Sequence, residues 1–286
     1  MASLAGKLLS DSTGGMILRV GVVLATLLVS TLAIAGGRVV SVGGSVTEIV
    51  YALGGGDRLV AADASSLYPP EAKRLPQVGY YRSLSVEGIL SVQPELLIAS
   101  ENSGPPAVLE RLQDMGVRTV SVPDSPGVES LMARVESVAQ ALGVPDAGAA
   151  LQARIRASLD EAASVPTHPR RALVVLHRGG PLMSAGSDTS VHALLELAGL
   201  ENAAAGVQGY RSLSPESIVA LAPDMVITTT LSAESAGGLA AFAAKPGVDA
   251  TPAAHAGRVV AIDDLLLLGM GPRVAEALRL LRTASN

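Results

Sequence analysis

Two adjacent tyrosines and an arginine carry the most distinctive chemistry in this sequence, in the segment GYYRSLS at residues 79–85. Aromatic residues are scarce, because the chain holds one Phe, five Tyr and no Trp. A tyrosine phenolate is a hard anionic oxygen ligand that suits ferric iron, and tyrosine is an established axial ligand of haem. A guanidinium such as that of Arg82 favours the phenolate over the phenol. The alternative is that Tyr80 and Tyr81 only cover an interface between lobes, since tyrosine commonly packs as an amphipathic residue.

The loop sequence YRSLS occurs a second time in the chain. YRSLSVEGILSVQPELLI begins at Tyr81 and YRSLSPESIVALAPDMVI begins at Tyr210, and the two segments agree at nine of 18 positions without a gap. A match in fixed register indicates two related lobes. It makes Tyr210 and Arg211 the counterparts of Tyr81 and Arg82, and we expect both to line the same cleft.

Sequence motifs typical of enzymes are absent. The chain has no G-x-S-x-G, P-loop or H-E-x-x-H motif, and its four histidines include no pair at the spacing of a local metal site. The lack of cysteine excludes thiolate metal sites, cysteine nucleophiles and disulfides. The net charge of -5 argues against nucleic acid as a partner. We therefore predict a non-enzymatic protein. An exported serine-dependent hydrolase is the alternative from a different class, because Ser184 and Ser187 lie near His177 and Asp188 in the sequence.

The N-terminal region is typical of a secretory signal. An apolar run from Val20 to Ala35 follows basic residues and ends in the small-x-small pattern Ala33-Ile34-Ala35. This pattern predicts a signal peptide at 1–35, cleaved near Ala35, with either Met1 or Met16 as the start. An uncleaved anchor is the alternative, although the run is short for a membrane span.

Strand-like and helical runs alternate along the rest of the chain, which predicts an α/β fold with mainly parallel sheets. The segment 128–163 differs, because its pattern is almost continuously helical and only Gly143-Val144-Pro145 interrupts it. We predict two Rossmann-like lobes joined by a long connecting α-helix. The predicted divisions are an N-terminal lobe at 36–125, a helical connector at 126–166 and a C-terminal lobe at 167–286. A long helix is stiff, so we expect it to limit closure of the lobes.

Four segments together resemble the haem-binding HmuT/PhuT/ShuT type of class III substrate-binding protein of ABC importers. They are SVGGSVTEIVYALGGGDRLVAAD from Ser41, YPPEAKRLPQVGYYRSLSVEGILSVQPELLIAS from Tyr68, the glycine-rich stretch from Gly179 and LGMGPRVAEAL from Leu268. The resemblance covers the whole chain after the predicted signal. It implies a periplasmic location and haem (hemin) as the transported ligand.

The resemblance also implies roles for individual residues. Tyr80 matches the axial haem ligand and Arg82 matches the arginine beside it. Tyr81 falls at a variable position, where it is either a substitute ligand or a stacking surface. His177 matches the place of a second haem ligand in some members, with a capping or core-edge histidine as the alternative. Tyr210 and Arg211 would line the cleft. The open rivals on the same scaffold are a ferric siderophore and a corrinoid.

Two glutamates are candidates for docking to the importer permease. Glu87 and Glu216 occupy equivalent positions of the repeat, each in the first turn of a predicted helix. Stabilisation of the helix dipole explains the same placement, and both roles are compatible. We further expect a monomer that binds no nucleic acid, with an outer-membrane haem receptor system upstream of it.

Overall fold

Two main sheets, one from each half of the sequence, organise the computed structural model, which describes residues 37–286. The predicted signal peptide at 1–35, its cleavage near Ala35 and the alternative anchor lie outside the described residues. Within 37–286, no helix combines the length and the apolar character that crossing a membrane requires.

The first sheet is parallel and has the strand order β2-β1-β5-β6. Its central strand β1 (Val39–Val42) is buried along its full length, as expected for a parallel sheet covered on both faces. The other elements of this lobe are β2 (Leu59–Ala62), β5 (Leu96–Ser100), β6 (Arg118–Val122), the helices α2 (Gly44–Ala52), α3 (Val86–Leu90) and α4 (Pro106–Asp114), and the short pair β3 (Gly79–Tyr80) and β4 (Ser83–Leu84).

The second sheet is mixed, with the order β10-β8-β7-β11-β12 and β9 (Glu201–Asn202) beside β7. Strands β7 (Arg171–Leu176), β11 (Met225–Thr229) and β12 (Val259–Ile262) are parallel, as the sequence predicted. Strands β8 (Met183–Ala185) and β10 (Tyr210–Ser212) add an antiparallel edge that the sequence reading missed. The helices of this lobe are α7 (Ser190–Leu197), α8 (Pro215–Leu221), α9 (Thr230–Ser235), α10 (Leu239–Ala243), α11 (Pro252–His255), α12 (Asp264–Leu268) and α13 (Val274–Ala284).

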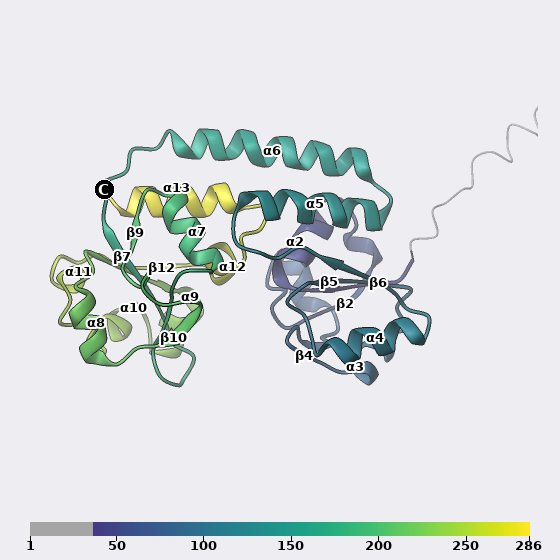
Figure 1. Ribbon diagram of the computed structural model, residues 1–286, viewed down its shortest axis with the longest axis horizontal. Coiled ribbons are helices and arrows are strands. Elements are labelled where there is room, and N and C mark those ends of the chain that lie inside the picture. The colour runs from purple at the N-terminus through teal and green to yellow at the C-terminus, as the bar shows by residue number, and fades with distance from the viewer. Residues whose placement is uncertain (1–36) are drawn as a thin grey trace, which may run out of the picture. The chain divides into compact units, whose positions relative to one another are not determined.

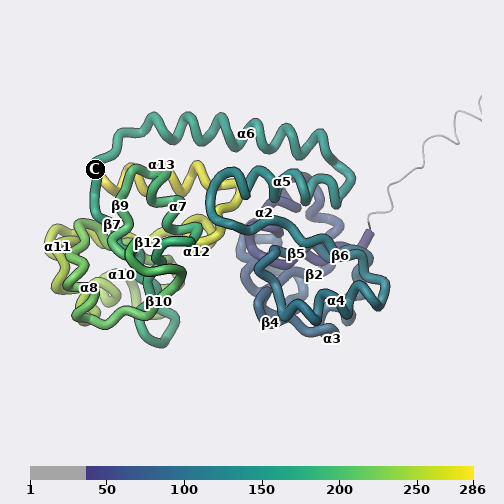
Figure 2. The backbone as a smooth tube through the Cα atoms, viewed as in Figure 1, coloured from purple at the N-terminus to yellow at the C-terminus, as the bar shows by residue number. Residues whose placement is uncertain are grey.

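The connector consists of α5 (Val128–Leu142) and the longer α6 (Pro145–Ala163). The break lies where the sequence placed it, because Gly143 adopts a left-handed conformation with φ 75° and Pro145 opens the next helix. Helix α6 runs along α5 at one end and along α13 at the other (Figures 1 and 2). The prediction of two α/β lobes joined by a long helix is confirmed, while the exact lobe boundaries remain predictions.

A single apolar core extends under the connector from one lobe to the other. It joins Ile49 of α2 and Leu131 of α5 to Ile155 of α6, and continues to Val174 of β7 and Leu278 of α13. Two smaller clusters lie within single lobes, one around Val40 and Leu97 and the other around Leu173 and Phe242. The lobes are therefore packed against common helices as well as linked by the chain, which favours small movements between them.

Candidate ligand-binding site

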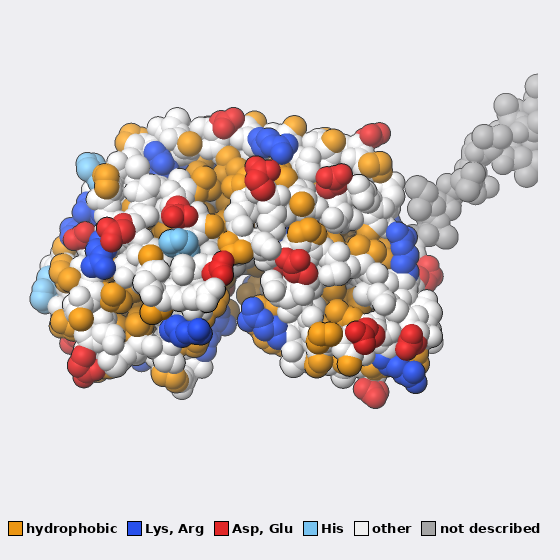
Figure 3. Space-filling view, viewed as in Figure 1, with side chains coloured by type: hydrophobic (Ala, Val, Ile, Leu, Met, Phe, Trp, Pro, Cys, Tyr) orange, Lys and Arg blue, Asp and Glu red, His pale blue; other side chains and the backbone are white. Residues whose placement is uncertain are grey.

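A notch separates the two lobes on the side away from α6, and Lys or Arg side chains lie on both sides of it (Figure 3). Loops that leave the carboxyl ends of the parallel strands are the usual ligand-binding positions of such sheets. The ligand-binding residues that the sequence predicts occur on these loops and on the neighbouring short strands.

The two tyrosines and the arginine lie in a tight hairpin. Tyr80 of β3 pairs with Ser83 of β4, so Tyr81 and Arg82 form the two-residue connection at the tip. The hairpin is fixed to the loop after β5, since Gly104 N–H donates to the Tyr81 carbonyl at 2.9 Å and Leu84 N–H donates to the Gly104 carbonyl at 2.9 Å. The Tyr80 side chain remains 44% exposed. Its phenol is therefore presented to solvent from a backbone that is held in place.

The three side chains of the hairpin stack in sequence order. The ring centroids of Tyr80 and Tyr81 lie 4.6 Å apart in an edge-on arrangement, with 62° between the ring planes. The Arg82 guanidinium carbon lies 4.7 Å from the Tyr81 centroid. The pKa of Tyr81 is well above its ordinary value, because the side chain is partly buried and hydrogen bonds with Tyr80. The Tyr81 ring therefore contacts both of its neighbours, and its role as a substitute ligand or a stacking surface stays a prediction.

Tyr210 of the second lobe lies near this hairpin. Burial raises the pKa of Tyr210, the charge of Arg82 opposes that shift, and Tyr80 adds to it. Because the interaction between charges weakens with distance, these effects indicate that Tyr80 and Arg82 lie near Tyr210. Arg211 is exposed, and its side chain donates to the Tyr210 carbonyl at 3.1 Å. Neither Arg82 nor Arg211 forms an ion pair with a carboxylate of residues 37–286.

The internal repeat is reproduced in local structure, with one difference. Ser85 caps α3 by accepting from Gly88 N–H, and Ser214 caps α8 by accepting from Ser217 N–H. Tyr81, however, lies at a hairpin tip, whereas its counterpart Tyr210 lies within β10. The two tyrosines therefore have different backbone settings.

His177 directly follows β7, at the edge of the sheet where the sequence placed it. Its backbone N–H donates to Ser232 Oγ at 3.1 Å. Its Nδ1 is buried and has no hydrogen-bond partner among residues 37–286. The ring is thus not engaged as a side-chain cap, and its role as a ligand stays a prediction.

The residues considered for a hydrolase have other partners. Ser184 Oγ donates to the Val174 carbonyl at 2.8 Å, and Ser187 Oγ donates to the Val207 carbonyl at 3.1 Å. Asp188 accepts from Gln208 at 2.9 Å. These hydroxyls and this carboxylate are engaged away from any histidine, so the arrangement lacks the contacts of a serine–histidine–aspartate site.

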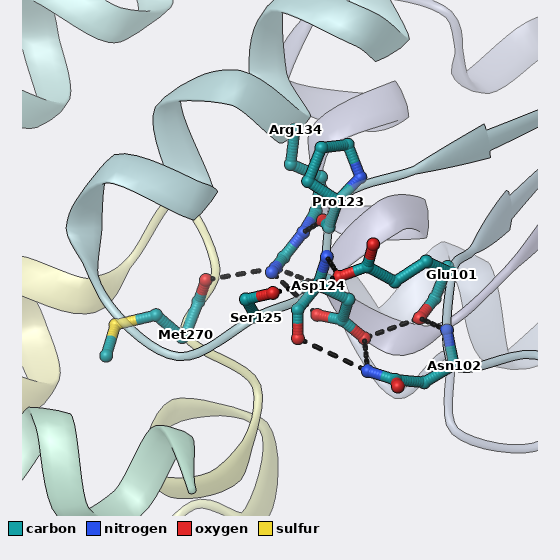
Figure 4. Close-up of polar contacts among 9 residues, drawn as sticks. Glu101, Asn102, Pro123, Asp124, Ser125, Arg134 and Met270 are labelled. Atoms are coloured by element: carbon teal, nitrogen blue, oxygen red, sulfur yellow. Dashed lines mark hydrogen bonds and ion pairs between the residues drawn. The ribbon is translucent and has the colours of Figure 1, made fainter. Parts of the chain in front are cut away.

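A buried arginine joins the lobes behind the notch, and the sequence reading missed it. Arg134 of α5 is fully buried, and its Nη2 lies 2.6 Å from Asp124 Oδ1. Its other nitrogens donate to the Pro123 carbonyl at 2.6 Å and to the Met270 carbonyl at 3.3 Å (Figure 4), and Nη1 also donates to Ser45 Oγ at 2.8 Å. One side chain thus binds the loop after β6, the start of α2 and the turn between α12 and α13.

A second ion pair connects the same two regions. Glu48 of α2 is buried, and its Oε1 accepts from the backbone N–H of Arg273 at 3.2 Å and from its Nε at 3.0 Å. The Arg273 guanidinium carbon lies 3.5 Å from the ring centroid of Tyr68. Desolvation raises the pKa of Glu48, and the contacts with Arg273 oppose that shift. A glutamate inside the apolar run VTEIVYAL was the available sequence signal, because a buried carboxylate requires a partner.

The structure has two α/β lobes with a notch between them, and it groups exposed phenol and guanidinium side chains near one another. This arrangement is typical of a two-lobe solute-binding protein. Residues 39–266 match the family described as periplasmic binding protein, and the chain belongs to this family. The structure is similar to the periplasmic heme-binding protein RhuT from Roseiflexus sp. RS-1 in apo form. That similarity has 40% identity and a TM-score of 0.82, over 87% of this chain and 97% of the other.

Two relatives found by sequence lie at lower identity. One is the uncharacterized ABC transporter substrate-binding lipoprotein YvrC of Bacillus subtilis, which is 28% identical over 84% of this chain and 76% of its own length. The other is the vitamin B12-binding protein of Photorhabdus laumondii, which is 29% identical over 66% of this chain and 70% of its own length. These proteins share the solute-binding class, but the name of YvrC states no ligand, and vitamin B12 differs from the heme in the name of RhuT.

Proposed function

We propose that this protein binds haem in the notch between its lobes and delivers it to an ABC-type importer. The observation that carries the proposal is the exposed Tyr80 phenol on an anchored hairpin, next to a guanidinium that has no carboxylate partner among the described residues. The 40% identity to a heme-binding protein over nearly all of that protein's length supports the same ligand.

In this proposal Tyr80 is the axial ligand of the haem iron and Arg82 supports it with positive charge. Arg82 and Arg211 are available to the two propionate carboxylates, because no acidic side chain of residues 37–286 neutralises them. Tyr210 lines the opposite side, and His177 is the candidate second ligand through its unpaired imidazole.

The siderophore rival is weakened by the placement of the other arginines. Arg178 is paired with Asp264 at 2.5 Å, and Arg273 is paired with Glu48 at 3.0 Å. Of Arg82, Arg178, Arg211 and Arg273, only Arg82 and Arg211 therefore lack a carboxylate partner among residues 37–286 and are left for an anionic chelate. A corrinoid carries amide side chains in place of propionates, so unpaired guanidiniums favour haem over that rival as well.

We further propose that the protein is exported to the periplasm with cleavage near Ala35, acts there as a monomer, and receives haem from an outer-membrane receptor system. These steps follow from the signal-like N-terminus and from the family, whose members bind solutes outside the inner membrane.

Titration of the exported protein with hemin tests the ligand assignment. We expect visible absorption bands of a ferric haem–phenolate complex that saturate with added hemin, because a phenolate oxygen binds ferric iron. Cyanocobalamin and a ferric siderophore, added in parallel, should neither bind nor displace hemin. Saturable binding of either compound with no hemin spectrum would refute the proposed ligand.

The docking role of Glu87 and Glu216 is a separate prediction. Both side chains are exposed in the first turn of their helices, and hydrogen bonds from the Glu216 N–H and from Ser214 lower the pKa of Glu216. Both side chains are thus accessible to basic residues of a permease. The double change Glu87→Arg and Glu216→Arg should leave hemin binding unchanged and reduce importer-dependent haem uptake at least about tenfold. The reason is that the attraction between these two positions and basic residues of the permease becomes a repulsion.

The matched control for docking is the double change Glu136→Arg and Glu276→Arg, which reverses the charge of two exposed glutamates of α5 and α13. This control changes the net charge by the same amount, and it should leave uptake at the parental rate. Full uptake by the Glu87/Glu216 variant would mean that these residues only stabilise their helix termini.

A further inference from the structure

Two large apolar side chains are exposed at the carboxyl edge of the second sheet. Met183 of β8 is 36% exposed and Leu231 of α9 is 38% exposed. Met183 pairs with Leu176, the last residue of β7. Leu231 follows β11, which runs parallel to β7 and ends at Thr229. Both side chains therefore lie where the parallel strands end, and ligands of open α/β sheets usually bind at such ends.

Met183 shares a face of the sheet with Tyr210. Ala185 of β8 pairs directly with Tyr210 of β10, and Met183 lies two residues before Ala185 on the same strand. Side chains two residues apart on a strand point to the same face, and diagonal neighbours on that face lie about 7–8 Å apart. Tyr210 in turn lies near Tyr80 and Arg82, whose charges act on it. Met183 is therefore on the face of the second lobe that carries a neighbour of the proposed iron ligand.

The backbone of His177 lies between the two apolar residues. His177 follows Leu176, the strand partner of Met183, and its N–H donates at 3.1 Å to Oγ of Ser232, the residue after Leu231. Strand β7 lies between β8 and β11 in the sheet. Met183 and Leu231 thus approach the end of β7 from its two opposite sides, with the proposed second ligand between them.

The carboxylate closest to this edge is fully compensated. Asp264 of α12 is buried, and its Oδ1 lies 2.5 Å from Nη2 of Arg178. Its Oδ2 accepts from the backbone N–H of Leu231 at 2.9 Å. The ion pair and the backbone donor leave no uncompensated charge on Asp264, so the exposed surface beside it is suited to an apolar ligand.

Aromatic side chains that could cover a porphyrin from the second lobe are few. The single phenylalanine, Phe242, is fully buried, and the chain has no Trp. Tyr210 is the only one of the five tyrosines that lies in the sequence after residue 166. A porphyrin is a large planar apolar ring, and apolar protein surface is needed to remove it from water. In this lobe most of that surface must come from aliphatic and thioether side chains.

We propose that Met183 and Leu231 form an apolar platform that contacts the porphyrin ring from the lobe opposite Tyr80. The inference rests on the proposed function and deepens it, because it assigns the residues that recognise the ring itself and not its iron or its propionates. The thioether of Met183 makes favourable contacts with aromatic rings, and its unbranched chain adapts to their position. The first lobe thus supplies the iron ligand and a positive charge, and the second lobe supplies apolar area.

The test compares hemin with metal-free protoporphyrin IX, which has the same ring and the same propionates but no iron. Met183→Gln and Leu231→Gln each place an unpaired amide against the ring, so each should weaken the binding of both compounds by about fivefold or more. The double change should weaken both by about twentyfold or more, since effects at separate sites add. The phenolate spectrum of bound hemin should remain in all three variants, because the iron–oxygen bond is not altered.

Matched controls separate the platform from a general loss of apolar surface. Met115 follows α4 and Leu280 lies in α13, and both are more exposed than the platform residues. Met115→Gln and Leu280→Gln should bind both compounds as the parent does. Met183→Leu keeps an apolar side chain of similar volume, so its affinities should stay within about twofold of those of the parent.

Binding of both compounds by the double variant within about twofold of the parent would overturn the platform. A parent that binds hemin and no protoporphyrin IX would also overturn it, because the apolar surface would then contribute too little. A parent that binds neither compound would instead refute the proposed function. Tyr80→Phe gives the converse pattern, with weaker binding of hemin and unchanged binding of protoporphyrin IX, so loss of the iron bond and loss of the platform are distinguished.

Discussion

Tyr80→Phe should abolish the phenolate absorption of the hemin complex and weaken hemin binding by roughly a hundredfold or more. Loss of an outer-shell partner of a metal already costs about ten- to a hundredfold, and Tyr80 would be the ligand itself. The substitution keeps the ring that contacts Tyr81 and removes only the hydroxyl. Because the side chain is 44% exposed, the free energy of unfolding should change by less than about 0.5 kcal/mol.

The decisive measurement is a visible spectrum together with a hemin titration of Tyr80→Phe and of the parent. Apolar contacts with the porphyrin remain in the variant, so hemin should still associate weakly. Arg82→Ala should be intermediate, because the phenolate remains and its protonated form becomes more competitive. An unchanged phenolate spectrum in Tyr80→Phe would move the search for the ligand to Tyr81, Tyr210 or His177.

The local features of the fold were predictable because they depend on neighbouring residues. The repeat predicted two equivalent helix starts, with Glu87 and Glu216 in the first turns, and in the structure Ser85 and Ser214 cap these two helices. The connector break at Gly143 was predicted from glycine and proline in the same way. Strands β8 and β10 were missed, because runs of three residues are too short to show the alternation that marks a strand.

The arrangement of the candidate site was only partly predictable. The sequence placed Tyr80, Tyr81 and Arg82 in one loop, but the order in which they stack depends on the anchoring of that loop to Gly104. The proximity of Tyr210 to the hairpin depends on how the lobes are packed, which no local pattern encodes.

The polar contacts of Arg134 and Glu48 between the lobes could not be predicted from the sequence for the same reason. Arg134 contacts Ser45 and Met270, which are 89 and 136 positions away, and Glu48 meets Arg273 across 225 positions. In the sequence, Arg134 lies in a helical segment rich in charged residues, where an arginine normally faces solvent. Its full burial is a consequence of the assembled lobes.

Arg134→Met should destabilise the protein by about 3 kcal/mol, the lower end of the effect of removing one partner from a buried ion pair. The change leaves Asp124, whose side chain is only 22% exposed, without its cation, and it leaves the Met270 carbonyl without a donor. Methionine keeps an unbranched apolar chain in place of the aliphatic part of arginine, so the lost ion pair and hydrogen bonds should account for most of the effect. The measurement is the free energy of unfolding from denaturant titration.

The Arg134→Met change should also increase the movement of the lobes relative to each other. In the parent, the shared core and the Arg134 junction hold the turn between α12 and α13 against α2, so solution scattering of the apo and hemin-loaded forms should nearly superpose. In Arg134→Met the shared core and the Glu48–Arg273 pair remain but the buried polar link is lost, and the apo form should scatter as a wider distribution of conformations. Arg154→Met, at an exposed arginine of α6, is the matched control.

The double change Arg134→Met and Asp124→Asn separates the ion pair from the rest of the junction. Because the uncompensated carboxylate is removed, this variant should be less destabilised than the sum of the two single changes, by about 1 kcal/mol or more. A loss of stability in Arg134→Met no larger than that in Arg154→Met would show that the buried arginine does not hold the lobes together. Additive single changes would show instead that Arg134 acts through its neutral partners, Ser45 and the carbonyls of Pro123 and Met270.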